Sequence, residues 1–156
     1  KHIPAKLLLV GDGPERNKIE SLCREISACD DIRFLGKIEA IEEVLSVADL
    51  FVMPSEKESF GLAALEAMAC EVPVISTNVG GLPELNIDGF CGYMSEVGDV
   101  ADMAKKALNI LDEQNLPEFK KNALARAQDF EISKILPRYE NYYRIVIENT
   151  KLNVPL

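Results

Sequence analysis

The chain is poor in the residues that build metal sites and in positive charge. It has one histidine, His2, and four cysteines that form no C-x-x-C pair. Zinc sites need Cys and His clustered at short spacings, so we expect no metal site. Lys and Arg total 17 against 26 Asp and Glu, which gives a net charge of −9. So acidic a surface repels phosphate backbones, which argues against a nucleic-acid partner.

Long hydrophobic runs are also missing. No apolar stretch approaches the roughly 18 to 20 residues that cross a bilayer, and no signal peptide opens the chain. We therefore expect no membrane span and a cytoplasmic protein whose cysteines stay reduced. The 156 residues are 47% hydrophobic, which suits about one globular domain rather than a disordered segment. The first residue is not Met, and we expect the sequence to be a piece of a longer chain.

Short apolar runs alternate with longer amphipathic ones. Apolar runs predict strands at residues 5–10, 32–35, 50–53, 73–76 and 90–94. Helical spacing predicts helices after Pro14, from Ile41, and at 61–70, 83–86, 100–112, 117–129 and 133–148. Strands that are apolar on both faces and separated by helices predict a parallel sheet covered on both sides. With right-handed crossovers, this is a doubly wound, Rossmann-like α/β fold.

Ligands of such sheets bind at the carboxyl ends of the strands, so the loops there matter most. The first, Gly-Asp-Gly-Pro-Glu-Arg at 11–16, starts like the dinucleotide fingerprint G-x-G-x-x-G. Arg16 stands where the third glycine belongs, and Pro14 removes a backbone donor from the helix start, which argues against NAD or FAD. No G-x-x-x-x-G-K-[ST] motif occurs either, so a P-loop is excluded.

The most informative segment follows the third expected strand and leads into a helix. Its central residues are Glu58, Ser59, Phe60, Gly61 and Leu62. The first turn of a helix carries free N–H groups and the positive end of the helix dipole. Glycine at position 61 also lets a ligand approach the backbone closely. The segment therefore predicts an anion site suited to a diphosphate.

The helix that follows presents one face with room for a bulky ligand. Four residues share this face at positions i, i+3, i+4 and i+7: Ser59, Leu62, Ala63 and Glu66. Glu66 would lie about where the ribose of a bound nucleotide lies, and a carboxylate accepts hydrogen bonds from both ribose hydroxyls. The eight-residue spacing of Glu58 and Glu66 is by itself weak evidence for a binding site. Glu140 and Glu148 have the same spacing on the last expected helix, where we expect both to be solvated.

Two further loops have open interpretations. Gly80 and Gly81 precede a short helix, where they either repeat the ligand-binding pattern or form an ordinary loop with a positive φ. Lys37 follows Gly36 at a strand end, where it either faces a base or phosphate or is simply solvated.

Three motifs in order carry a resemblance to a known family. They are Glu-Ser-Phe-Gly-Leu-Ala-Ala-Leu-Glu at 58–66, Val-Pro-Val-Ile at 72–75 and Val-Gly-Gly-Leu-Pro-Glu at 79–84. Together they resemble the retaining GT-B glycosyltransferases of family 4, and the similarity runs from about Ala5 to Val146. The resemblance implies a two-lobed enzyme of which this chain is the carboxyl-terminal, donor-binding lobe without its first strand. Residues 1–130 would form the Rossmann-like lobe, and 131–156 a helix that packs towards the absent amino-terminal lobe.

The resemblance also assigns roles by position. Glu58 would be the catalytic residue beside the donor sugar ring, and Glu66 would bind the ribose hydroxyls. The sugar and diphosphate would be held by the backbone of a turn that consists of Ser59, Phe60, Gly61 and Leu62. The base would be held by a second stretch that consists of Gly36, Lys37 and Ile38. The family's phosphate-binding Arg and Lys would precede Lys1. Glu71 stands where the family usually has Gly, which we expect to change only a helix cap.

Residues 34–37 and 55–61 look most like the bacillithiol-pathway members of this family, which are bacterial. That likeness implies transfer of N-acetylglucosamine from UDP-N-acetylglucosamine to L-malate, without a metal or cofactor. The small acceptor would be held by the missing amino-terminal lobe. Three alternatives stay open: a family-4 enzyme with another nucleotide sugar and a lipid or polysaccharide acceptor, a non-catalytic sugar-nucleotide-binding module, and an unrelated Rossmann-like interaction domain.

The missing first strand would be central in the strand order 3-2-1-4-5-6. Strands 5–10 and 50–53 would then lose their shared neighbour, and bare apolar edges favour association. We expect either direct pairing of these two strands or a surface supplied by a second copy, as in a homodimer. We also expect the last helix to present apolar surface that this chain does not cover, through Ile135, Tyr139, Tyr142, Tyr143 and Val146.

Overall fold

The computed structural model describes residues 3–152, and side chains as far as Thr150. His2 and the last residues of the expected helical segment 131–156 lie outside the described residues. Contacts divide the chain into two compact units, Lys1–Val44 and Leu45–Leu156, and each unit is described by itself. The division at residue 130 implied by the family stays a prediction.

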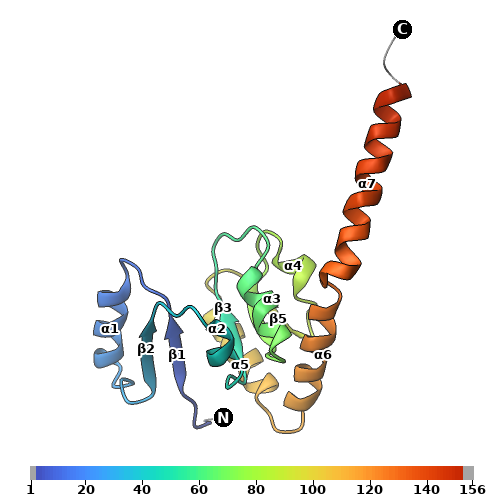
Figure 1. Ribbon diagram of the computed structural model, residues 1–156. Helices are drawn as coiled ribbons and strands as arrows, with labels where there is room; N and C mark the ends of the chain where they lie inside the picture. Colours follow the sequence, from blue (N-terminus) through green and yellow to red (C-terminus); the bar gives the residue numbers. More distant parts are fainter. Residues whose placement is uncertain (1–2, 153–156) are drawn as a thin grey trace. The chain divides into compact units, whose positions relative to one another are not determined.

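The first unit is a βαβ arrangement (Figure 1). Strand β1 (Leu7–Val10) is followed by helix α1 (Arg16–Glu25) and strand β2 (Ile32–Gly36), and the two strands are parallel. Leu9 lies opposite Phe34, and the register shifts after it so that Val10 lies opposite Gly36. The strands form where the apolar runs end in glycine. Helix α2 (Ile41–Leu45) spans the sequence boundary between the units.

The second unit contains a three-stranded parallel sheet in the order β3-β4-β5. Its strands are β3 (Phe51–Met53), β4 (Val74–Thr77) and β5 (Gly92–Ser95). Its helices are α3 (Leu62–Ala69), α4 (Leu82–Leu85), α5 (Val100–Ile110), α6 (Leu116–Gln128) and α7 (Ile132–Leu152). The central strand β4 is buried along its whole length, and Ile75 on it joins Ile110 and Phe119 in the apolar core.

The predicted parallel α/β fold is confirmed. The predicted direct pairing of β1 with β3 would join the two units and stays a prediction. In the sheets that the described residues form, β1 pairs with β2 and β3 pairs with β4. Successive strands in each sheet are joined by one local helical crossover. Apolar side chains on β1 are exposed, with Leu7 47% and Val10 40% exposed. Association with a second copy stays a prediction.

Two residues other than glycine have a positive φ, and both lie just after the end of a helix. The structure confirms that Glu71, where the resemblance predicts Gly, lies just past helix α3 and has a positive φ of 62°. Its N–H donates to the Met68 carbonyl and the N–H of Val72 donates to the Ala67 carbonyl, the pattern of a Schellman cap. Ser27 occupies the same left-handed position after α1, with φ 56°. Both caps therefore place a residue with a side chain at a position with a positive φ, where glycine would be less strained.

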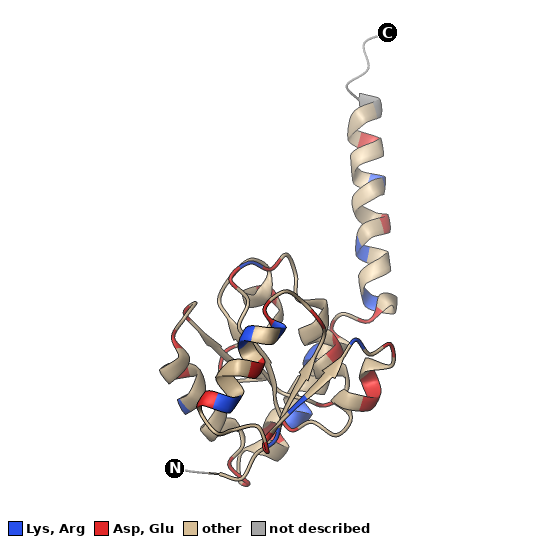
Figure 2. Ribbon diagram, turned by 90° about the vertical axis from the view of Figure 1, so that its left-hand side faces the viewer, with Lys and Arg blue, Asp and Glu red and all other residues tan. Residues whose placement is uncertain are grey.

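The last helix exposes an apolar surface, as predicted. Tyr139, Tyr142 and Tyr143 are 57%, 62% and 59% exposed, Val146 is 43% exposed, and Ile135 is half-buried. Figure 2 shows that both basic and acidic residues occur along α7. Within residues 3–152, none of the helices is both long enough and apolar enough to cross a bilayer.

Candidate functional site

The segment predicted to bind an anion forms a turn between β3 and α3, at residues 58–61. Gly61 adopts the left-handed conformation, with φ 97°, immediately before the first residue of α3. A Cβ at this position would lie 2.6 Å from Cδ2 of Leu82, so any other residue requires the Leu82 side chain to move. Gly61 brings no side-chain cap, and the first-turn N–H groups of α3 are thus left for another acceptor.

The loop after β4 holds this turn in place. Thr77 Oγ1 donates to the Ser55 carbonyl over 2.6 Å, and the N–H of Gly81 donates to the Ser59 carbonyl over 3.1 Å. A Cβ on Gly80 would lie only 1.6 Å from the Glu58 carbonyl oxygen. Gly80 has the positive φ, 56°, of the ordinary-loop interpretation. Both glycines in addition allow a close backbone contact with residues 58–60, which the sequence did not predict.

Aromatic packing fixes the turn from the other side. The Phe60 ring meets Phe130 edge to face, with centroids 5.6 Å apart. The guanidinium of Arg126 lies over the Phe130 ring at 4.7 Å, and its Nε donates to the Leu85 carbonyl at the end of α4. The half-buried Phe60 thus packs against Phe130, just after α6, and Arg126 links Phe130 to the end of α4.

The backbone donors of the turn converge on one oxygen. Oε1 of Glu58 accepts hydrogen bonds from the N–H of Ser59 at 2.9 Å and of Phe60 at 3.3 Å. The Ser59 hydroxyl also lies 3.5 Å from this oxygen. A carboxylate thereby occupies the donors that the sequence predicts for a sugar diphosphate. The turn can accordingly receive one anionic oxygen, at the positive end of α3.

One face of α3 is open to solvent beside this turn. Leu62 is 65% exposed, and Ala63 and Glu66 are exposed, whereas Ala64 and Ala67 on the opposite face are fully buried. The structure thus presents the predicted ligand face, with Glu66 one turn beyond Leu62. The predicted contact of Glu66 with a ribose stays a prediction.

The residues predicted to hold the base belong to the first unit. Gly36 ends β2 with φ 69°, and its carbonyl accepts a hydrogen bond from the N–H of Gly11 over 2.7 Å. This bond brings together the carboxyl ends of β1 and β2. Lys37 is exposed and Ile38 is half-buried directly after that end. Their backbone groups can thus be reached at the edge where Rossmann-like sheets bind ligands.

Arg16 is a residue at this edge that sequence reasoning did not propose. Its Nη1 would lie 3.9 Å from a Cβ on Gly36, and its guanidinium lies 5.8 Å from the Phe34 ring centroid. Nε donates to Glu20 one turn along α1. The available signal was its place in the first turn after a glycine loop, but the sequence analysis used Arg16 only to reject a dinucleotide fingerprint.

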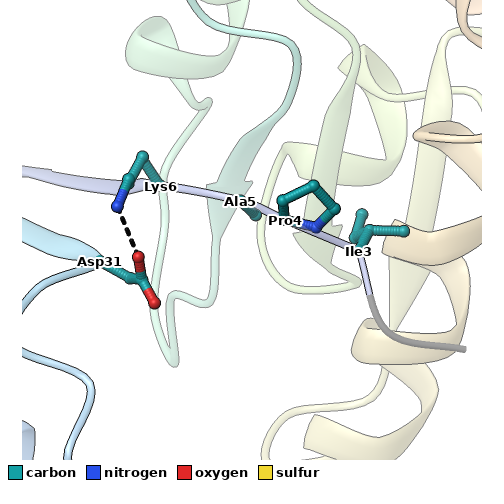
Figure 3. Close-up of a pocket in the computed structure, with 5 residues that line it drawn as sticks. All are labelled: Ile3, Pro4, Ala5, Lys6 and Asp31. Carbon is teal, nitrogen blue, oxygen red and sulfur yellow. Dashed lines mark hydrogen bonds and ion pairs between the residues drawn. The ribbon is translucent and has the colours of Figure 1, made fainter.

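A pocket in the first unit lies away from these loops. Figure 3 shows it lined by Ile3, Pro4, Ala5, Lys6 and Asp31, with an ion pair between Lys6 and Asp31. These residues precede β1 and β2, so the pocket lies at the amino-terminal ends of the strands, opposite the Gly11–Gly36 contact. It contains none of the predicted site residues.

Asp102 forms an ion pair with Lys106 near the end of β5, and its pKa is lowered. The Lys106 ammonium and the Ser95 hydroxyl both donate to Oδ2 of Asp102, and these bonds lower the pKa of that carboxyl. The hydrogen bond from Lys106 links α5 to β5, because the same ammonium also donates to the Met94 carbonyl. The pair thus has a structural role in the second unit.

Comparisons with known proteins agree on one family. Residues 1–126 match the family model described as glycosyl transferases group 1. The N-acetyl-alpha-D-glucosaminyl L-malate synthase of Bacillus anthracis is 44% identical over 154 residues, which cover 96% of this chain and 40% of that protein.

Two solved structures match in fold and partly in sequence. Sucrose-phosphate synthase from Thermosynechococcus elongatus superimposes with a TM-score of 0.81 at 35% identity, over 92% of this chain and 39% of that one. The Anabaena protein HepE in complex with UDP gives 0.79 at 26% identity, over 90% and 41%. This chain thus spans about two fifths of the length of each relative. The chain belongs to the group 1 glycosyltransferases and has the Rossmann-like α/β fold of their GT-B domains.

Proposed function

We propose that the chain is the donor-binding lobe of a retaining glycosyltransferase that transfers N-acetylglucosamine from UDP-N-acetylglucosamine to L-malate. The observation that carries the proposal is the 58–61 turn, whose N–H groups converge on one anionic oxygen at the amino end of α3. Similarity to the malate synthase at 44% identity supports this donor and acceptor, and the similar UDP complex of HepE supports a uridine nucleotide.

The turn would act on the leaving group. As the bond between sugar and diphosphate breaks, negative charge grows on the β-phosphate of UDP. Backbone N–H groups of residues 59–62 and the positive end of α3 are already oriented before the reaction, so they stabilise this charge at no further cost in reorganisation. The acceptor hydroxyl would attack from the side of the leaving group, as the resemblance implies.

Glu58 and Glu66 would bind different parts of the donor. When donor oxygens take the N–H groups of Ser59 and Phe60, the carboxylate of Glu58 is released from them and can accept from a sugar hydroxyl. Glu66, on the exposed face of α3, would accept from the ribose hydroxyls. In the first unit, the backbone at Gly36, Lys37 and Ile38 would contact the uracil. No step of this role uses a resident metal or cofactor.

A cytoplasmic location and a small-molecule acceptor held by a further lobe complete the proposal. The four cysteines are free thiols, as is usual in a reducing compartment. A second candidate function is a group 1 enzyme with another nucleotide sugar and acceptor. The sucrose-phosphate synthase match at 35% identity favours it, because a similar chain belongs to an enzyme with a different name.

The test uses the full-length protein that carries this sequence. It is incubated with UDP-N-acetylglucosamine, UDP-glucose or GDP-mannose, each with L-malate, and products are identified by mass spectrometry while UDP binding is measured by calorimetry. We expect a malate glycoside from UDP-N-acetylglucosamine alone. UDP binding without that product would leave the second candidate, and absence of UDP binding would overturn the first.

A further inference from the structure

Two cysteines of the first unit lie against each other. Sγ of Cys23 is 2.7 Å from Sγ of Cys29, and both are free thiols. A disulfide bond is about 2.05 Å long, so the two sulfurs need to approach by only about 0.7 Å to bond. Cys23 is 3% exposed, whereas Cys29 is exposed to solvent. One sulfur of the pair is thus accessible to a reagent and the other is not.

The backbone cap of α1 creates this juxtaposition. The N–H of Ala28 donates to the Cys23 carbonyl and the N–H of Ser27 donates to the Arg24 carbonyl, the two bonds of a Schellman cap. Ser27 has the left-handed conformation, which reverses the chain direction at the end of α1. The residue after the cap, Cys29, is thereby returned to the side chain of Cys23. The hydrogen-bonded backbone of this cap therefore brings the two thiols together.

We propose that Cys23 and Cys29 form a reversible internal disulfide when the protein meets a low-molecular-weight disulfide. The Cys29 thiolate attacks one sulfur of the reagent, forms a mixed disulfide and releases one thiol. Cys23 then loses its proton and attacks the Cys29 sulfur, which forms the internal bond and releases the second thiol. Overall, two protein thiols are oxidised to one disulfide, and the reagent is reduced to two thiols.

The environments of the two sulfurs fix the order of attack. The hydrogen bond to Cys29 and burial raise the pKa of Cys23 to about 11, which keeps that thiol protonated and unreactive towards a reagent in solution. Once Cys29 carries a mixed disulfide, its sulfur lies within reach of Cys23 as an electrophile. The exposed cysteine is thus the entry point and the buried one completes the bond.

The disulfide would lie away from the proposed donor site. Cys29 precedes β2 at its amino-terminal end, and Gly36 lies at the carboxyl-terminal end of the same strand. The proposal does not depend on the glycosyltransferase function, and oxidation should leave the affinity for UDP unchanged. Its direct effect is to join the end of α1 to the segment that leads into β2.

The test treats the reduced full-length protein with oxidised glutathione, blocks remaining thiols with iodoacetamide and maps tryptic peptides by mass spectrometry. Trypsin cleaves after Arg24, so an internal bond joins two otherwise separate peptides. We expect this linked pair in the wild type and in Cys70→Ser, a matched control in the second unit. In Cys23→Ser, a glutathione adduct should accumulate on Cys29, and in Cys29→Ser, Cys23 should stay unmodified.

Ser27→Gly provides a variant that preserves the cap, because glycine readily adopts a positive φ. It should form the linked pair at least as fast as the wild type. A lasting glutathione adduct on wild-type Cys29, dimers linked through Cys29, or loss of the linked pair in Ser27→Gly would each overturn the proposal.

Discussion

Replacing Gly80 by alanine should damage the donor turn without touching a side chain of the site. The new Cβ would lie 1.6 Å from the Glu58 carbonyl oxygen, which must retreat by about 1.4 Å to reach the 3.0 Å that real Cβ contacts respect. The φ of 56° adds about 1–2 kcal/mol of strain for a residue with a Cβ. A displacement of about 1 Å can lower activity by about 100-fold, and each lost hydrogen bond to a charged phosphate costs about 1.5–3 kcal/mol of affinity.

Gly98→Ala is the matched control. Gly98 also has a positive φ, of 83°, but nothing lies within 4 Å of its Cβ position, so this variant should lose about 1–2 kcal/mol of stability through strain alone. Calorimetric titration with UDP should find affinity at least about tenfold lower in Gly80→Ala, from one lost hydrogen bond to phosphate, and unchanged in Gly98→Ala. Equal UDP affinities in folded samples of the two variants would refute the reasoning that the Gly80 contact positions the turn.

Three further predictions concern other residues. Glu66→Ala should weaken UDP binding by about 1–3 kcal/mol through the lost ribose bonds, while Glu140→Ala should leave it unchanged in the same titration. Glu71→Gly should raise the free energy of unfolding, measured in urea, by about 1 kcal/mol, because glycine relieves the strain of the positive φ; a loss of stability would contradict this. The pKa of Asp102 is lower in the folded protein than in the unfolded chain, where it is about 3.9, so the ionised carboxylate stabilises the fold at pH values above 3.9. This stabilisation is lost as the pH falls through the pKa of the folded protein. Unfolding measured from pH 3 to 6 should therefore show a smaller acid-side loss in Asp102→Asn than in the wild type.

Local features of the fold could be predicted because single short segments determine them. The apolar run before Gly36 predicts β2, and the run between Pro73 and Thr77 predicts β4, since glycine and proline limit strands on either side. Helix α3 follows from Ala, Leu and Met after a glycine. The exposed face of that helix could also be predicted, because helical periodicity places Leu62 and Glu66 together. Its role in binding a ligand stays a prediction.

Contacts between distant segments could not be predicted in the same way. The approach of Gly80 to the Glu58 carbonyl depends on two loops that follow different strands, so a glycine alone does not reveal it. The direct pairing expected between β1 and β3 would join the two units and stays a prediction, whereas the pairs within each unit follow from local crossovers. Cys23 and Cys29 also gave no signal, since their contact depends on a left-handed Ser27, a conformation that sequence assigns to glycine first.

A crystal structure of the full-length protein with UDP-N-acetylglucosamine would test the central claim most directly. We expect diphosphate oxygens bonded to the N–H groups at the amino end of α3, with the Glu58 carboxylate displaced from the N–H groups of Ser59 and Phe60. We also expect the ribose hydroxyls within hydrogen-bond distance of Glu66. A diphosphate bound on another element, with Glu58 Oε1 still accepting from both N–H groups of the turn, would contradict this claim.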